Sequence, residues 1–452
     1  MKDEVVREIL REGRLYEVGG CVRDALLYHL PEVKDRDYLV CGIPFERLTQ
    51  ILKRYGRVDL VGRSFGVIKF TPQGANGIYD VSLPRRERST GSGHTDFEVD
   101  FDPSLGVKED LGRRDFSINA MARDMADGVL IDPFDGQKDL NDRIIRMVAP
   151  DSFTEDPLRM LRAMQFAARF EFTIEPATYE ALVANADLIT TVSPERVAEE
   201  LNKMLVRAVR PSIGLRLMLH TGLLHHILPE LEPTVGCEQP GGYHAYDVFE
   251  HTVRIVDACP PRLHLRLAAL FHDITKPRHK RPTADGASFY GHEISGAETA
   301  KQVLKRLRYS TDIIKDVTLL IERHMFTTDV GAKGLRRFIR RIGQRLIPDL
   351  LDLRRADVVA QGMGGVTADV DRMEEAIREE IERKPPFGRS DLAINGQTIM
   401  NSFHLDASPL IGDVINYLME KVLDDPAENQ PDILLRHAGE FLRNKGYDQN
   451  VK

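Results

Sequence analysis

Several features that define common classes of protein are missing from this sequence. Its 452 residues include four scattered cysteines and no C-x-x-C pair, so we expect reduced thiols, with neither a disulfide framework nor a cysteine zinc site. No long apolar run occurs either. The N-terminal stretch MKDEVVREILREG is charged and amphipathic, which predicts neither a signal peptide nor a membrane span. These absences favour a cytoplasmic protein that does not bind a membrane.

An excess of positive charge is absent as well. Lys and Arg number 62 against 70 Asp and Glu, for a formal net charge of −8. This balance argues against bulk electrostatic attraction to nucleic acid, so any such binding must use local basic patches. What remains is a globular composition, 42% hydrophobic and 29% charged, and a length that predicts roughly two to four domains.

Two carboxylates stand one residue apart at the entrance to an apolar, β-favouring run, in KDRDYLV at 34–40. Alternate side chains of a strand share a face, so Asp35 and Asp37 are expected to point the same way. A hard cation such as Mg²⁺ would relieve their repulsion, because it takes oxygen ligands and keeps positions open for substrate phosphates. Taken alone, such a pair is more often a solvated strand end.

A glycine-rich turn upstream gives the pair a context. A predicted strand at 15–18 leads into Gly19 and Gly20, and then into an apolar helix with Arg23 in its first turn. Glycines let backbone N–H groups approach an anion, and the helix N-terminus adds partial positive charge that Arg23 supplements. The glycines by themselves could be a plain tight turn. Together with the acidic pair, they predict a site that handles phosphates.

Three further segments of the first third carry expectations. Asp80 lies on a predicted strand at 77–81, where it is either a third acidic group at the same metals or a strand-end residue. The stretch that begins PRRERSTGSGH at residue 84 is rich in turn formers and charges, which predicts a mobile loop. FSINAMA at 116–122 predicts a helix, and DPFDG at 132–136 predicts a turn.

These pieces resemble the polymerase-β-type head of the class II tRNA nucleotidyltransferase and bacterial poly(A) polymerase family. The matching motifs, GGCVRD, DRD, RRDFSINA and DPFDG, cover most of residues 15–147. The resemblance implies that Asp35 and Asp37 hold two Mg²⁺ ions, which activate an RNA 3′-hydroxyl and stabilise charge on the NTP α-phosphate and the leaving pyrophosphate. Asp80 is the candidate third catalytic carboxylate. The implied nucleotide-binding residues are Gly19, Gly20, Arg23, Arg114 and Asp115.

A helix is predicted to begin in the segment SFTEDPLRMLRA, at 152–163. Its first residues can cap it, and its proline suits a first turn. Asp156, Arg159 and Arg162 are spaced by three, so they are expected along one helix face, where the plain alternative is a surface ion-pair ladder.

The resemblance assigns this helix to base recognition. ED-x-x-R at 155–159 matches the family motif that pairs with the incoming base. An Asp acceptor beside an Arg donor can accept both cytosine and adenine and reject guanine and uracil. Arg162 is similar to a phosphate or ribose contact. Gln165 stands where many relatives carry arginine, which weakens one substrate contact. The segment ER-x-x-EE at 195–200 is expected to order neighbouring helices through ion pairs.

The middle of the chain indicates a second metal site. A histidine, a His-Asp doublet and a distant aspartate, each on an apolar predicted helix, suit a divalent metal with mixed nitrogen and oxygen ligands: His251, His272, Asp273 and Asp357. The set resembles the HD phosphohydrolase superfamily, in which His292 and His324 match additional histidines that support a second metal or bind phosphate. The resemblance implies a divalent transition metal and a hydrolase that opens 2′,3′-cyclic phosphates or removes terminal phosphates from RNA ends.

We therefore expect an α+β protein in which a small polymerase-β-like head with a mixed sheet precedes a mainly helical remainder. The expected parts are the head at 1–150, a helical neck at 151–235, an HD domain at 236–385 and an RNA-binding tail at 386–452. The basic run KGLRRFIRR at 333–341 either touches RNA or is the solvated face of a packed helix, and we favour the packed helix.

The expected activity is template-independent addition of C, C and A to the 3′ end of tRNA from CTP and ATP. An enzyme that adds only A would share nearly every motif. A poly(A) polymerase is disfavoured by the composition and by the turn RSFG at 63–66, and a CC-adding enzyme by the full-length stretch after Pro84. An HD RNA phosphohydrolase whose head only binds RNA is disfavoured by the intact Asp35 and Asp37 pair.

Overall fold

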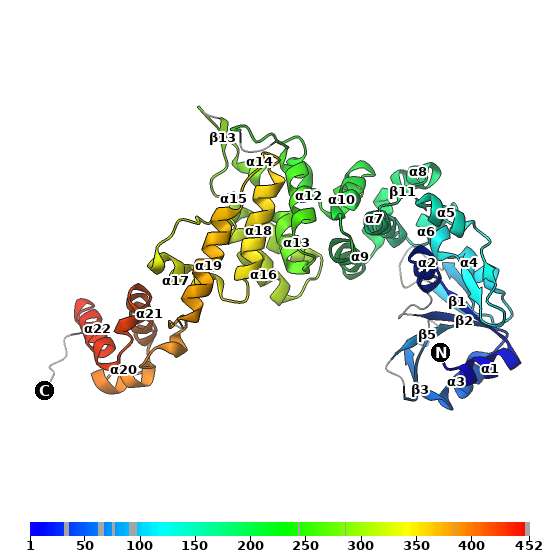
Figure 1. Cartoon of the computed structure of the whole chain (residues 1–452), viewed down its shortest axis with the longest axis horizontal. Coiled ribbons are helices and arrows are strands. Elements are labelled where there is room, and N and C mark those ends of the chain that lie inside the picture. Colours follow the sequence, from blue (N-terminus) through cyan, green and yellow to red (C-terminus); the bar gives the residue numbers. More distant parts are fainter. Residues whose placement is uncertain are drawn as a thin grey trace. The chain divides into compact units, whose positions relative to one another are not determined.

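The computed structural model describes residues 1–30, 36–61, 67–74, 77–89, 97–242, 245–284, 286–383 and 385–447. The chain divides into two compact units. The first contains 1–232 and 303–309, and the second contains 233–302 and 310–452. The first unit begins with a sheet flanked by helices, whereas the second is almost entirely helical (Figure 1).

A mixed seven-stranded sheet forms the head, in the order β3-β4-β5-β2-β1-β8-β9. Its strands are β1 (Arg14–Val18), β2 (Asp37–Cys41), β3 (Gly56–Val61), β4 (Val67–Pro72), β5 (Tyr79–Ser82), β8 (Ala122–Asp124) and β9 (Leu130–Ile131). β2 and β5 run parallel, and the other neighbouring pairs are antiparallel. The parallel pair sets the first residue of β2, Asp37, directly opposite Asp80 of β5.

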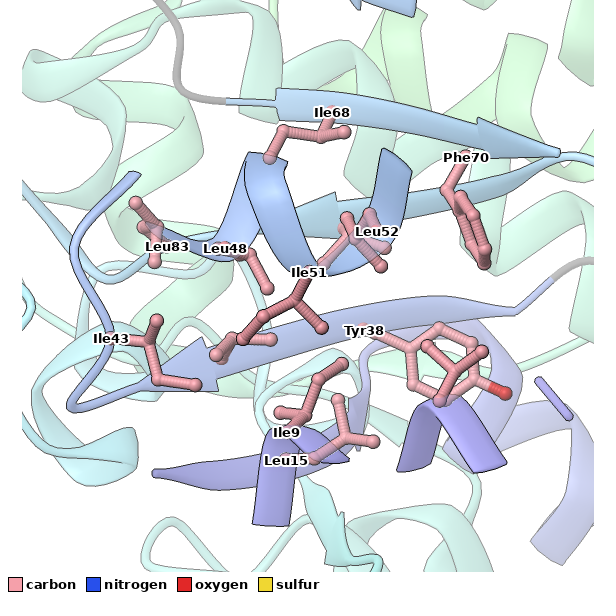
Figure 2. Packing of buried hydrophobic residues seen from close by; sticks show 13 residues of the cluster. Ile9, Leu15, Tyr38, Ile43, Leu48, Ile51, Leu52, Ile68, Phe70 and Leu83 are labelled. Carbon is pink, nitrogen blue, oxygen red and sulfur yellow. The ribbon is translucent and has the colours of Figure 1, made fainter. Parts of the chain in front are cut away.

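Apolar side chains cover both faces of β2. Tyr38 and Val40 pack into a core that includes α1 (Asp3–Glu12) and α3 (Phe45–Lys53), whereas Leu39 joins a second core with α4 (Val107–Gly112). Figure 2 shows the first of these cores. A slip of one residue would exchange the two faces, so this double burial fixes the register of the strand. The position of Asp37 is fixed with it.

Two segments of the head differ from the sequence expectation. Part of the stretch predicted as a loop forms two antiparallel strands, β6 (Arg85–Ser89) and β7 (Phe97–Phe101), while 90–96 lie outside the described residues. Cross-strand pairing supports these strands although their apolar pattern is weak. The helix predicted at 116–122 was also wrong. A 3₁₀ turn, η1 (Ser117–Asn119), is followed there by β8, which pairs with β1.

The neck breaks at Asp156, where one continuous helix was predicted. α6 (Ser152–Glu155) ends there, and α7 (Leu158–Phe170) begins two residues later. Asp156 has extended backbone, with φ −137° and ψ 97°, because the following Pro157 disfavours helical geometry at the preceding residue. Asp156 is therefore not on the helix face that carries Arg159 and Arg162, contrary to the prediction.

The rest of the first unit packs around α7, which contacts α9 and α10. Its elements are α2 (Gly20–Leu27), α5 (Gly136–Asp142), β10 (Ile144–Ile145), β11 (Thr173–Ile174), α8 (Pro176–Ala184), η2 (Ala186–Thr191), α9 (Pro194–Arg207), α10 (Pro211–His220), α11 (Leu223–Ile227) and η3 (Pro229–Thr234). The parallel pair β10–β11 joins the end of the head to the neck.

The second unit is built on α12 (Val248–Ala258), α13 (Leu263–Phe271), α16 (Thr311–Arg323) and α18 (Ile347–Ala360), which pack on one another. Its other elements are α14 (Lys276–His279), β12 (Arg281–Thr283), β13 (Gly286–Ser288), α15 (His292–Arg306), α17 (Ala332–Ile342), α19 (Ala368–Glu382), η4 (Arg389–Asp391), α20 (Gly396–Phe403), α21 (Pro409–Asp424), η5 (Pro426–Glu428) and α22 (Pro431–Asn444). The last three helices enclose an apolar core of their own. Among the described helices, none is long and apolar enough to cross a membrane.

The basic run of the sequence lies on α17, and its central arginine is buried. Arg336 donates to the carbonyl oxygens of Leu423 and Asp424 at the end of α21, at 2.6 and 2.9 Å, and to Glu380 of α19 at 2.9 Å. Leu335 is buried beside it. These contacts favour the packed-helix interpretation of the run over an RNA contact.

Candidate functional site

A cavity of about 490 Å³ lies in the first unit, between the head and helices α7 and α9. All the predicted nucleotide-binding residues line it, together with Asp37: Gly19, Gly20, Arg23, Arg114, Asp115, Asp156, Arg159 and Arg162. Further basic side chains line it as well, namely Arg113, Arg169, Arg196, Lys203 and Arg207. Cationic groups outnumber the acidic ones on this wall, which suits a polyphosphate ligand in a chain whose net charge is negative.

The glycine turn at the start of α2 is held close to an arginine. Gly19 has φ +74°, and a Cβ built on it would lie 2.5 Å from Nη1 of Arg114. Arg114 donates to Asp110 at 3.2 Å, and its buried Nε has no hydrogen-bond partner in the described part of the chain. Only glycine satisfies both the backbone and the approach of this guanidinium. A positive group therefore lies over the helix start, where backbone N–H groups also attract anions.

Arg23 is held by protein partners although it borders the cavity. It is 4% exposed, donates to Asp24 and Asn119, and lies against the rings of Phe166 and Phe170, at 5.4 and 4.8 Å from their centroids. These contacts fix the guanidinium between α2 and α7. A direct contact with phosphate stays a prediction for this residue.

The carboxylate of Asp115 is buried and fully engaged. One oxygen accepts from Nε and Nη2 of Arg162, at 2.8 and 2.7 Å, and the other accepts from the backbone N–H of Phe116 and from Asn119. Burial alone would raise the pKa of Asp115, but the charge of Arg162 and the hydrogen bonds lower it below its usual value. Asp115 is thus an ionised anchor that orients Arg162 toward the cavity.

Asp156 and Arg159 reach the cavity from different backbone settings. The carboxylate of Asp156 accepts from Arg196 at 3.0 Å and from the N–H of Leu158 at 3.2 Å. Arg159 donates to Ser152 at 3.0 Å, to Glu155 at 3.2 Å and to the carbonyl of Arg113 at 2.7 Å.

Hydrogen bonds to other protein groups therefore fix the side chains of both Asp156 and Arg159. Among the described contacts, no hydrogen bond joins the side chains of Asp156 and Arg159, although the backbone N–H of Arg159 donates to the carbonyl of Asp156 at 3.0 Å. An acceptor and a donor of fixed orientation consequently border the same space, as reading the edge of a base requires.

Of the acidic pair Asp35 and Asp37, the structure describes only Asp37. Asp35 lies outside the described residues. Asp37 begins β2 and borders the cavity, and its register partner Asp80 is on the adjacent strand but does not line the cavity. Opposed residues of paired strands share a face, so these two carboxylates are neighbours. Lys69 lies 3.3 Å from Asp80 and partly offsets its charge.

A second cavity, of about 660 Å³, lies in the second unit, and five of the six predicted HD residues line it, all except His251. The six residues form two groups whose ligand atoms lie within 4.8 Å of one another: His251, His272 and Asp357, and Asp273, His292 and His324. All six are buried. Nε2 of His251 lies 3.1 Å from Asp357, and Nε2 of His292 lies 3.2 Å from Asp273.

Backbone carbonyls orient three of these histidines. Nδ1 of His272 donates to Ala269 at 2.8 Å, and Nδ1 of His292 and His324 donate to Phe289 and Ile321, each at 2.7 Å. These bonds place the proton on Nδ1 and leave the Nε2 lone pair free to bind a metal.

Electrostatics favours an ionised Asp273 and a neutral His324, whereas burial works to lower the pKa of His272 and the charge of Asp273 raises it. Burial works to raise the pKa of Asp273, but His272 and Lys276 hold it well below its usual value. Burial lowers the pKa of His324 to about 3, which keeps this ring neutral.

The residues present fit a metal centre. Nε2 of His272 and both carboxylate oxygens of Asp273 are buried without hydrogen-bond partners in the described part of the chain. Nε2 of His272 and Nζ of Lys276 lie 3.0 and 2.7 Å from the Asp273 carboxylate, but neither is aligned with it for a hydrogen bond. Unpaired acceptor atoms that converge on one point are what a bound cation would satisfy.

Comparison with known proteins places these sites in a family. Residues 15–146 match the family described as poly A polymerase head domain, 171–234 the one described as "probable RNA and SrmB-binding site of polymerase A", and 241–362 the HD domain. A multifunctional CCA protein of Azoarcus sp. (strain BH72) is 40% identical over 319 residues, or 69% of this chain and 73% of that protein. The chain belongs to the class II tRNA nucleotidyltransferase and poly(A) polymerase family. It is a member with an HD domain.

Two further likenesses place this nucleotidyltransferase more closely. An A-adding tRNA nucleotidyltransferase of Deinococcus radiodurans is 36% identical over 335 residues, covering 70% of this chain and 75% of that one. The crystal structure of the Bacillus stearothermophilus CCA-adding enzyme in complex with CTP has a TM-score of 0.71 at 23% identity, over 98% of this chain and 97% of that one. This last likeness shows the fold, and the expected α+β architecture of head and helical remainder is confirmed.

Some residues of the nucleotidyltransferase site were not singled out from the sequence. Asn119 holds both Arg23 and Asp115, and it stands inside the motif RRDFSINA, where its role was not read. Arg196 and Glu200 were expected only to order helices, yet Arg196 binds Asp156 in the cavity. Their signal was the charged ER-x-x-EE spacing, which cannot by itself tell a helix contact from a cavity wall.

Proposed function

We propose that this chain adds C, C and A in turn to the 3′ end of tRNA from CTP and ATP. The observation that carries the proposal is the cavity in which the fixed pair of Asp156 and Arg159 faces the same space as Asp37 and the basic wall. The relatives named as multifunctional CCA protein support it. The expected cytoplasmic location and the four-part division of the chain remain predictions.

The metals proposed for the head are Mg²⁺ ions held by Asp37 with its sequence neighbour Asp35, and by Asp80 as the candidate third ligand. Two adjacent carboxylates on one face offer the oxygen donors that this cation prefers. Bound there, Mg²⁺ would stabilise the charge on the transferred phosphoryl group and lower the pKa of the attacking 3′-hydroxyl. The hydroxyl gives up its proton to solvent and its oxygen forms a bond to the α-phosphorus, while the bond from that phosphorus to the bridging oxygen breaks and pyrophosphate leaves.

The chain's own residues account for positioning and choice of nucleotide. Arg114 and the helix start at Gly19 bind the phosphates, and Arg162, oriented by Asp115, contacts phosphate or ribose. Asp156 accepts from the exocyclic amino group of cytosine or adenine, and Arg159 donates to the neighbouring ring nitrogen. Guanine and uracil present the opposite pattern and would leave both groups unpaired, which disfavours them.

Removal of a metal ligand tests this proposal. Asp37→Ala should abolish incorporation of CTP and ATP into tRNA that lacks its CCA end, while phosphate release by the HD domain continues. Asp37→Asn, which keeps the size of the side chain, should behave in the same way. Incorporation at the wild-type rate in either variant would contradict the proposal and favour an RNA phosphohydrolase with a binding head.

We also propose that the HD domain is a metal-dependent phosphohydrolase that acts on RNA 3′ ends. The six converging ligand atoms support a divalent transition metal. Lys276 and Arg354 border the cavity and can bind phosphate oxygens. Water adds to the phosphorus of a 2′,3′-cyclic phosphate, one P–O bond to the ribose breaks, and the freed ribose oxygen takes the proton. Replacing His272 and Asp273 by alanine should stop both the opening of the cyclic phosphate and the release of a terminal phosphate, and should leave nucleotide addition intact; unchanged hydrolysis would overturn the assignment.

A further inference from the structure

The HD cavity has an exposed aromatic side chain at its rim. Tyr290 lines the cavity and yet is 89% exposed. Met325 also lines the cavity and is 58% exposed. Single exposed apolar side chains are ordinary on a protein surface. Here two of them line a cavity that also carries charged groups, and a nucleotide, with its base and its phosphate, combines the two kinds of surface that such a cavity would match.

The backbone under this tyrosine is held firmly although its ring is free. Nδ1 of His279 donates to the carbonyl of Tyr290 at 2.9 Å, and Nδ1 of His292 donates to the preceding carbonyl of Phe289 at 2.7 Å. Nε2 of His279 is in turn bonded to Ser295 at 2.7 Å. The ring therefore projects from a loop that is tied to the metal ligand His292. A tyrosine on an anchored backbone has only two side-chain torsions to order, so a base that stacks on it costs little entropy.

Basic residues flank the same mouth. The segment KPRHKR at 276–281 contains four lysines and arginines, and Arg278 and Arg281 are exposed. Arg281 of β12 is the register partner of Ser288 in β13, and Ser288 lines the cavity. A local basic patch of this kind is how a chain of net charge −8 can bind an RNA backbone. Aromatic platforms beside basic tracks are typical of single-strand binding.

We propose that the HD cavity takes the 3′ end of single-stranded RNA, with its last base stacked on Tyr290 and the upstream phosphates along Arg278 and Arg281. The terminal phosphate then reaches the metal ligands, between Lys276 and Arg354. This inference rests on the proposed phosphohydrolase function and adds a base requirement to it. Glu293, the acidic side chain that also lines the mouth, disfavours substrates that carry further phosphates at that point.

The test compares two substrates on the full-length, metal-loaded protein. One is a short oligoribonucleotide with a 2′,3′-cyclic phosphate, and the other is glycerol 1,2-cyclic phosphate, which has no base. Tyr290→Ala should raise KM for the oligoribonucleotide about tenfold, with kcat unchanged and glycerol cyclic phosphate turned over as in the wild type. Tyr290→Phe should behave as wild type. Ile294→Ala is the matched control, because Ile294 is 55% exposed nearby but does not line the cavity.

Binding provides a readout that does not depend on turnover. An oligoribonucleotide with 2-aminopurine as its last base should lose fluorescence on the wild type and on Tyr290→Phe, but not on Tyr290→Ala. In the double variant Arg278→Ala/Arg281→Ala, the slope of log affinity against log salt should fall by about 1.4.

Two outcomes would overturn the inference. One is an equal loss of turnover of both substrates in Tyr290→Ala, which indicates a structural role. The other is a Tyr290→Ala variant whose binding of the oligoribonucleotide and KM for it are unchanged. If the wild type turns over neither substrate but still quenches 2-aminopurine, the phosphohydrolase function is contradicted, whereas stacking of the RNA base on Tyr290 is supported.

Discussion

The guanidinium of Arg162 meets the buried carboxylate of Asp115 through two donors, at 2.8 and 2.7 Å. Asp115 comes from the head and Arg162 from α7, so this pair ties the head to the helix that we propose reads the base. The remaining oxygen of Asp115 is held by Asn119 and a backbone N–H. The pair is therefore both a structural link and a support for the cavity wall.

Loss of this link should destabilise the first unit. Asp115→Ala leaves the arginine without its buried partner and should lower the free energy of unfolding by about 3 kcal/mol. Asp115→Asn keeps the shape and should cost less. Urea unfolding measures both. An alanine variant as stable as the wild type would show that water replaces the carboxylate at no cost.

The same residue predicts a pH effect. Because the pKa of Asp115 is lowered in the folded state, its stabilising contribution is present above the unfolded value of about 3.9 and is lost as the pH falls toward the folded value. Below about pH 4, the wild type should lose stability more steeply than Asp115→Asn. Parallel curves for the two proteins in that range would contradict the assignment.

Gly19 should be intolerant of a side chain for two reasons that can be separated. Gly19→Ala places a Cβ 2.5 Å from Arg114 and forces a residue with a side chain to φ +74°. Gly128 has φ +77° with nothing within 4 Å of its Cβ position, so Gly128→Ala reports the cost of a positive φ without a steric clash, about 1 kcal/mol.

Only Gly19→Ala should lower nucleotide incorporation, by about 100-fold, because Arg114 must move. Steady-state incorporation and thermal unfolding of the two variants provide the comparison. Equal activity in both would show that Arg114 is not needed where it lies.

Arg196 should act on base choice through Asp156. Its removal frees the carboxylate from the 3.0 Å contact that orients it, so Arg196→Ala should lower kcat/KM for CTP and ATP about tenfold and increase incorporation of UTP and GTP. Arg196→Lys should recover part of the loss. A fall in rate without loss of base selectivity would indicate that Arg196 binds RNA instead.

Removal of the HD metal should destabilise the second unit. Without a cation, the neighbouring carboxylates of Asp273 and Asp357 repel each other. Treatment with a chelator, followed by return of Mg²⁺ for the head, should lower Tm by at least about 3 °C. The variant His272→Ala/Asp273→Ala should show no such shift. Calorimetry provides the readout, and an equal shift in wild type and variant would place the metal elsewhere.

The sequence is most predictive where local pattern and chemistry coincide. An apolar run buried on both faces fixes the strand that begins at Asp37, and the glycine turn at Gly19 follows from a strand-to-helix change within a few residues. The His-Asp doublet directly follows the apolar end of α13, Leu267 to Phe271, which leaves little room for a different placement. These features depend on neighbours in the chain.

Other features depend on partners that are far away in the chain. The strand at 122–124 forms because β1 is beside it, against the helical preference of its own residues. The role of Asn119 requires Arg23 and Asp115 to meet it. By contrast, the break at Asp156 is local. Pro157 predicts this break, but the three-residue spacing of Asp156, Arg159 and Arg162 favoured an unbroken helix.

The most direct test of the account supplies the purified protein with three tRNAs, ending before the CCA, after CC, or complete. Each is given CTP, ATP or both. We predict that the first tRNA gains two C residues from CTP alone and a full CCA from both nucleotides, that the second gains one A, and that the complete tRNA gains nothing. Incorporation of ATP alone, and only into the tRNA that ends in CC, would contradict CCA addition and assign the chain to A-adding enzymes.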